Sequence, residues 1–194
     1  MKTDVKISYL AIARAAYANA IENAEFIIGV YKNFKDSKGE PYDPQQTLEE
    51  FDIVLQYSLM QIAVSNFNLE AEELTFIKNL TKYGDLAYYL DSYLDDSKWT
   101  WEKFLSVDPI ILKSVIADMK EHMRNLADDF VFIFSIVDKI TKDTDYSAIL
   151  TVQTLMIVET VKKLGDSTIP ESDEDCLMYE ICNEIKRNKE NFED

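Results

Sequence analysis

The sequence predicts an all-α fold, a multi-helix bundle of about seven to eight helices in a single domain spanning 1–194. Three observations lead to this prediction. Apolar residues recur at steps of three and four along most of the chain, whereas no segment alternates with a period of two. Only four Gly and four Pro occur, too few for the turns of many short strands. An apolar share of 47% supports a sizeable core.

The first half of the chain contains three helical segments in this prediction. Residues 4–34 carry an apolar stripe with helical spacing and are followed by the linker-like KDSKGEPYDPQQ at 35–46. The next residues, TLEE, form a capping box that predicts a helix start at Thr47. That helix runs to the hairpin SNFN at 65–68, and we expect Gly84 to cap the helix after it.

The second half predicts further helices with clear end signals. Residues 85–107 predict one or two short helices whose tryptophans pack into the core. An Asp-Pro pair at 108–109 supplies an N-cap followed by proline, so a long helix should start there. Another helix is expected over about 146–164, ending at Gly165, and a last helix begins near Leu177.

The charge balance restricts the partners. The chain has 20 basic and 36 acidic residues, for a net charge of −16. Such a surface repels nucleic-acid phosphates and anionic membranes, so we expect neither as a partner. It fits a cation or a basic protein. The N-terminus lacks the apolar core of a signal peptide, and the run FVFIFSIV at 130–137 is too short to cross a bilayer, so we expect a cytoplasmic protein.

The nucleophiles and soft ligands are few. Cys176 and Cys182 on one helix would lie about 9 Å apart, beyond the roughly 7 Å limit of a disulfide, so we expect reduced thiols. Two cysteines so spaced and a single histidine do not build a zinc site. His122 is expected to be a solvated surface residue, and no phosphate-binding glycine loop occurs. The sequence therefore predicts a protein that is not an enzyme.

The hairpin has a counterpart later in the chain. When the chain is shifted by 100 residues, NFNLEAEE falls on DSTIPESD, with Leu69 on Ile169 and Glu73 on Asp173. Each stretch places an aliphatic residue three after a polar one, and a carboxylate four further on. The aliphatic residue would fill the gap between two helices. The acids would lie in the first turn of the second helix, where the helix dipole favours them.

This unit resembles the helical hairpin of the tellurite-resistance TerB family and the related amino-terminal domain of DjlA-type membrane co-chaperones. Their signature is an Asp-Gly-x-Ile-x-x-x-Glu turn after an apolar helix. The resemblance implies a compact all-α fold with an internal duplication over 47–84 and 146–189. It also implies acidic turns that bind divalent metal, which here would be Ca²⁺ or Mg²⁺.

Under this resemblance, the acidic positions of the signature correspond to Asn66 and Glu73 in the first copy and to Asp166 and Asp173 in the second. The first copy has lost one charge, so the second, with Glu171 nearby, is the better candidate for a cation. Water would complete the shell of six to eight oxygens that Ca²⁺ takes. An EF-hand is excluded because position twelve counted from either turn is aliphatic.

Two functions from different classes follow. The leading one is a non-enzymatic, cytoplasmic, TerB-like helical protein that acts through protein contacts or weak divalent-cation binding, in a stress-related setting that the resemblance alone implies. The alternative is an acidic decoy or inhibitor, a nucleic-acid mimic or immunity-type protein, that binds a basic partner. A metal-dependent hydrolase is a weaker third and would need converging carboxylates. The sequence leaves the oligomeric state open.

Overall fold

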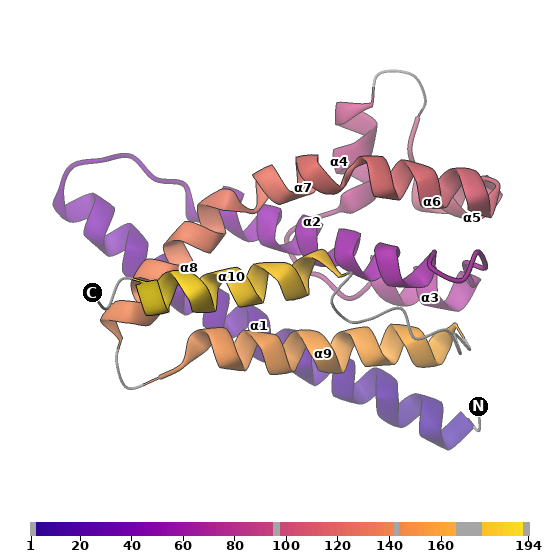
Figure 1. Cartoon of the computed structure of the whole chain (residues 1–194), viewed down its shortest axis with the longest axis horizontal. Helices are drawn as coiled ribbons and strands as arrows, with labels where there is room; N and C mark the ends of the chain where they lie inside the picture. Colours follow the sequence, from indigo (N-terminus) through magenta and orange to yellow (C-terminus); the bar gives the residue numbers. More distant parts are fainter. Residues whose placement is uncertain (1–2, 95–97, 142–143, 166–175, 192–194) are drawn as a thin grey trace.

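The computed structural model describes residues 3–94, 98–141, 144–165 and 176–191, which fold into helices without a strand (Figure 1). The predicted all-α class is confirmed. The described residues form ten helices rather than the expected seven to eight. They are α1 (Thr3–Ser37), α2 (Pro44–Ala63), α3 (Ala71–Lys78), α4 (Leu86–Tyr93), α5 (Trp101–Ser106), α6 (Pro109–Asp118), α7 (Lys120–Leu126), α8 (Asp128–Ile140), α9 (Tyr146–Leu164) and α10 (Leu177–Asn191).

Helix α2 lies at the centre of the bundle. Every residue from Phe51 to Met60 is buried, and the helix packs against α1, α3, α4 and α6 through α10. The long helix α1 lies along α9 and α8, and α10 packs between α8, α9 and α2 (Figure 1). A helix buried on all sides needs apolar residues all round, which the sequence FDIVLQYSLM largely supplies.

The start of α2 differs from the prediction. The helix begins at Pro44, one turn before Thr47, because Asp43 provides a better N-cap. The Asp43 carboxylate accepts a hydrogen bond from the backbone N–H of Gln45 at 3.0 Å, and proline suits the first helical position. Thr47 is buried inside the helix, where its Oγ1 accepts a hydrogen bond from the Tyr42 hydroxyl at 2.9 Å.

Gly84 does not cap a helix, contrary to expectation, since α3 ends at Lys78 with Asn79 as its C-cap. A Cβ on Gly84 would lie 2.5 Å from the backbone oxygen of Glu49. Glycine is therefore needed here because the loop after α3 presses against α2. Farther on, Trp99 and Trp101 are buried in the core, as predicted.

The segment after Pro109 forms three helices instead of one. The Asp108 carboxylate accepts a hydrogen bond from the backbone N–H of Ile110 at 2.9 Å, which confirms the predicted helix start. The helix is then interrupted at Met119 and at Ala127, where ψ is −8° and −15°. These values stay near the helical region, so the chain bends around α2 without unwinding.

A buried carboxylate joins α2 to α1 and to the loop after α3. Asp52 is fully buried, and its oxygens lie 3.0 Å from the Tyr17 hydroxyl, which donates to them. The same carboxylate accepts hydrogen bonds from the backbone N–H groups of Lys82, Tyr83 and Gly84 at 3.0, 2.6 and 3.2 Å. Burial raises the pKa of Asp52, and these hydrogen bonds act in the opposite direction.

Other polar side chains of α2 bind the starts of two helices. Gln56 accepts a hydrogen bond at 2.7 Å from the backbone N–H of Leu86, the first residue of α4. Ser58 and Gln61 accept hydrogen bonds at 2.9 and 3.0 Å from the first two residues of α10. Because the first N–H groups of a helix have no partner within it, α2 fixes where both helices begin.

We predict that Asp52→Ala lowers the free energy of unfolding by about 3–5 kcal/mol, because it leaves the part-buried N–H groups of Tyr83 and Gly84 and the Tyr17 hydroxyl without this acceptor. Urea unfolding followed by circular dichroism measures the change. Tyr17→Phe is the matched control. It removes one donor to the same carboxylate, and the Lys82 N–H, which also donates to the Tyr17 hydroxyl, keeps Asp52 as an acceptor, so the change should cost only about 1 kcal/mol. Equal losses in the two variants would contradict the central role of the carboxylate.

Candidate functional site

The hairpin residues Asn66 and Glu73, proposed as cation ligands through the TerB resemblance, have local structural partners. The Asn66 side-chain oxygen accepts a hydrogen bond from the backbone N–H of Asn68 at 3.0 Å. Glu73 is only 1% exposed and accepts a hydrogen bond from the backbone N–H of Glu70 at 2.8 Å, which caps α3. The structure thus uses both side chains to close the turn.

The Glu73 carboxylate lies beneath the end of α9. A Cβ on Gly165 would overlap the carboxylate, so the glycine that ends α9 also leaves room for it. Burial raises the pKa of Glu73 to about 7, with a smaller contribution from the charge of Glu70. Leu69, the predicted wedge of the first copy, is partly buried against the core.

The second-copy residues lie outside the described residues: Asp166, Ile169, Glu171 and Asp173. The internal duplication and the cation site in this segment therefore stay predictions. In the part of the chain that the structure describes, no three His, Cys, Asp or Glu side chains are grouped so that they could hold a metal ion. The converging carboxylates that a metal-dependent hydrolase needs are not found in that part either.

For the second copy, we predict that millimolar Ca²⁺ or Mg²⁺ raises the melting temperature of the native protein. Asp166→Ala together with Asp173→Ala should abolish the rise, and Glu73→Gln, which neutralises the capping carboxylate of the first copy, should preserve it. Differential scanning fluorimetry with and without a chelator measures the effect. The cation component of the sequence-based hypothesis is wrong if the native protein shows no rise.

For Glu73, we predict that Glu73→Gln stabilises the protein at about pH 8 by roughly 1–3 kcal/mol. A raised pKa means that the folded state binds a proton which the unfolded state has lost above its ordinary pKa of 4.5. Glutamate therefore loses stability as the pH rises from about 4.5 through about 7, whereas glutamine keeps its acceptor and stays neutral. Urea unfolding at several pH values tests this. An equal gain at about pH 4 would contradict the titration of Glu73.

His122 is half-buried, not solvated as predicted. Its Nε2 lies 2.5 Å from the Tyr89 hydroxyl, and its ring stacks on Tyr93 with centroids 3.9 Å apart. Burial lowers the pKa of His122. No described carboxylate or nucleophile is hydrogen-bonded to the ring, which instead attaches α4 to α7. Cys176 and Cys182 are both buried and form no disulfide, and burial raises the pKa of Cys182 to about 12.

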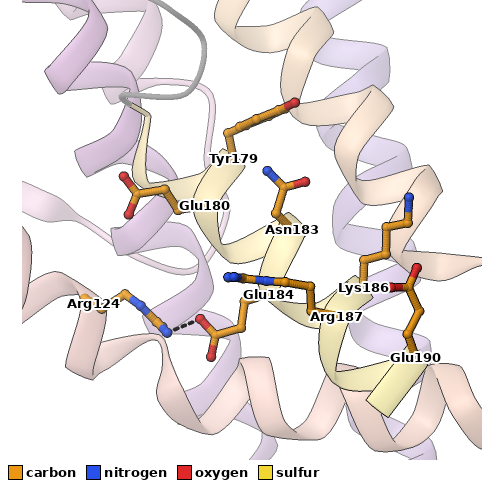
Figure 2. A pocket seen from close by; sticks show the side chains of 8 residues that line it. All are labelled: Arg124, Tyr179, Glu180, Asn183, Glu184, Lys186, Arg187 and Glu190. Carbon is orange, nitrogen blue, oxygen red and sulfur yellow. Dashed lines mark hydrogen bonds and ion pairs between the residues drawn. The ribbon is translucent and has the colours of Figure 1, made fainter. Parts of the chain in front are cut away.

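A surface cavity of about 730 Å³ lies on the outer side of α10 beside α7 (Figure 2). Figure 2 shows the ion pair between Arg124 of α7 and Glu184 of α10 at this cavity. Lys120 pairs with Glu180 one turn earlier, at 2.5 Å. The charged lining is balanced, with three cations and three carboxylates. These pairs join two helices, and no lining side chain is arranged as a nucleophile with a base. The lining consists of Arg124, Tyr179, Glu180, Asn183, Glu184, Lys186, Arg187 and Glu190.

The other notable feature is apolar and lies near the C-terminal end of α1, beside α8. We call it the aromatic surface, and it consists of Phe26, Tyr31 and Phe34 of α1, Tyr42 of the following loop, and Phe132 and Ile140 of α8. Four of these side chains are about half exposed or more: Phe26 (50%), Phe34 (49%), Phe132 (52%) and Ile140 (65%). Helices α1 and α8 pack against each other, and the Phe26 ring stacks on Tyr146 of α9, with centroids 5.7 Å apart.

Tyr31 connects the rings. Its ring centroid lies 6.3 Å from Phe34, 5.1 Å from Tyr42 and 6.5 Å from Phe132, the last two in edge-to-face orientation. Such a network holds the exposed rings in place without burying them. The apolar stripe that packs α1 into the core does not include Phe26 or Phe34. Large apolar residues outside that stripe were the available sequence signal for this surface.

Three carboxylates interact with one another near the starts of α2 and α8: Glu49, Glu50 and Asp129, which we call the carboxylate trio. Glu49 and Glu50 each accept one hydrogen bond from a glutamine amide, at 3.0 and 2.8 Å. Within the described residues, no member forms an ion pair. Burial raises the pKa of Glu50, and the charges of Asp129 and Glu49 raise it further. The trio is therefore a site of uncompensated negative charge.

Comparison of the chain with protein-family models, with curated proteins and with solved structures finds no match. In the described residues, no helix is both long and apolar enough to cross a membrane. The geometry of the surface is therefore the basis for assigning a function.

Proposed function

We propose that this protein is a non-enzymatic protein-binding module and that the aromatic surface is where it contacts a basic protein partner. The supporting observation is a cluster of half-exposed aromatic rings on a chain with a net charge of −16. Exposed apolar patches on soluble proteins mark interaction sites, and aromatic residues are enriched at the centres of interfaces.

Phe132 and Phe34 are the exposed rings that a partner would cover. Fully burying one phenylalanine is worth about 1.5–3 kcal/mol, so covering two half-exposed rings gives a useful part of a micromolar affinity. In the free protein both rings are about half exposed, and the Lys38 ammonium lies 4.3 Å from the centre of the Phe34 ring. The acidic charge of the chain favours a basic partner over an acidic one through complementary fields.

The TerB resemblance would place this contact in a stress-related setting. The alternative, an acidic decoy, also binds a basic partner, but it needs only charge. The two functions differ in whether exposed apolar side chains contribute to binding. Substitution of the aromatic surface therefore distinguishes them.

We predict that a photo-crosslinking benzoylphenylalanine at Phe132, introduced in cells that naturally produce the protein, gives one dominant adduct with another protein. Adding Phe34→Ser to the same chain should lower the adduct yield about fivefold or more, because a second exposed ring that, like Phe132, contacts Tyr31 is lost. The adduct is measured by immunoblot and identified by mass spectrometry.

The matched control places the same crosslinker at Tyr88 of α4, a side chain that is 77% exposed and outside the aromatic surface. It should give no such adduct. Equal adducts at both positions, or a yield unaffected by Phe34→Ser, would contradict a contact at this surface. A loss of binding only when acidic residues are neutralised would favour the decoy.

A further inference from the structure

Resting on the proposed function, we infer that the partner segment is a basic amphipathic helix, whose apolar side covers the aromatic surface and whose Lys or Arg side chains pair with the carboxylate trio. The inference specifies both the shape and the charge of the partner. The observation behind it is that exposed aromatic rings lie next to carboxylates that have no ion-pair partner among the described residues.

Two members of the trio, Glu50 and Asp129, lie next to the aromatic surface. Tyr42 is half-buried beside them. Its ring is 5.1 Å from Tyr31, and its hydroxyl donates to Thr47, less than one turn before Glu50 on α2. Asp129 lies three residues before Phe132 on α8, so both are on the same side of that helix. A ligand covering Phe132 therefore comes within reach of Asp129 and Glu50.

In the part of the chain that the structure describes, the carboxylate trio has no cation beside it that forms an ion pair. Near the end of α1, Lys32 pairs with Asp36 at 2.8 Å and Lys35 with Glu40 at 2.6 Å, whereas the Lys38 ammonium lies 4.3 Å from the centre of the Phe34 ring. None of these three lysines forms an ion pair with the trio. The trio has only the glutamine amides. A cation from outside would relieve the repulsion among the three carboxylates, whereas a nucleic acid or an anionic membrane would add to it.

The exposed apolar side chains form pairs along α1 and along α8. Phe26 and Phe34 are eight residues apart on α1, and Phe132 and Ile140 are eight apart on α8, so each pair spans about two helical turns. Two neighbouring helices with apolar rows of this length suit a third helix with anchors at similar spacing. A second copy of this chain is disfavoured because a two-fold contact through the same surface would bring one trio towards the other.

The test uses two labelled peptides of about 14 residues, roughly four helical turns. One has leucine and lysine in an amphipathic helical pattern, and the other has glutamate at every lysine position. Fluorescence anisotropy measures binding to the full-length protein. We expect the lysine peptide to bind at least about tenfold more tightly than the glutamate peptide, with an affinity that falls as salt rises.

Three variants assign the contributions. Glu49→Gln, Glu50→Gln and Asp129→Asn together should weaken the lysine peptide about tenfold. The matched control neutralises three exposed carboxylates elsewhere, through Asp118→Asn, Glu159→Gln and Glu190→Gln, and should weaken it less than about threefold. The third variant, Phe34→Ser with Phe132→Ser, should also weaken it about tenfold. Circular dichroism confirms that each variant is folded; these positions are exposed or half-buried.

The outcomes separate this inference from the proposed function. If the trio variant and the control lose affinity equally, the attraction is non-specific and the inference is overturned. If the phenylalanine variant loses binding but the trio variant does not, the inference is overturned and the aromatic contact stands. If the phenylalanine variant binds as the native protein does, the aromatic contact fails as well, and the proposed function with it.

Discussion

The structure depends on the buried polar side chains of α2. A buried backbone N–H without an acceptor costs about 1–3 kcal/mol, and every helix starts with such groups. Asp52 supplies acceptors to the loop after α3, Gln56 to the start of α4, and Ser58 and Gln61 to the start of α10. The register of one central helix therefore fixes three other segments. The apolar core makes the chain compact, and these hydrogen bonds select its arrangement.

Local chemistry explains which parts of the fold were predictable. The helix start at Pro109 and the end at Gly165 follow from side chains next to each other in the chain, and both predictions are confirmed. The predicted helix start at Thr47 was wrong because a second start signal, Asp43 followed by proline, lies one turn earlier. The interruptions at Met119 and Ala127 had no local signal. They arise where the chain follows the surface of α2, which residue spacing does not reveal.

The candidate sites show the same limit. The residue spacing in the sequence correctly predicted that Glu73 lies in the first turn of a helix. It could not predict that Gly165, at the end of α9, lies against the Glu73 carboxylate. His122 was expected in water because its neighbours in the chain are polar, yet its ring packs on tyrosines of α4. The aromatic surface was missed for a different reason. The helical spacing of apolar residues predicts which side chains face the core. Apolar residues outside that spacing, such as Phe26 and Phe132, were given no role.

The carboxylates of α2 and of the start of α8 differ in what stabilises them. Asp52 is buried and surrounded by donors, so folding explains it fully. Asp129 lies in the first turn of α8, where the helix dipole stabilises a negative charge. Glu49 and Glu50 lie beyond the first turn of α2, and among the described residues each carboxylate accepts a hydrogen bond only from a glutamine amide, whereas the charge of Asp129 repels Glu50. Under the proposed contact, the charge of a cationic partner would offset that repulsion. Glu49 and Glu50 would then have a role in binding in addition to their hydrogen bonds with the glutamines.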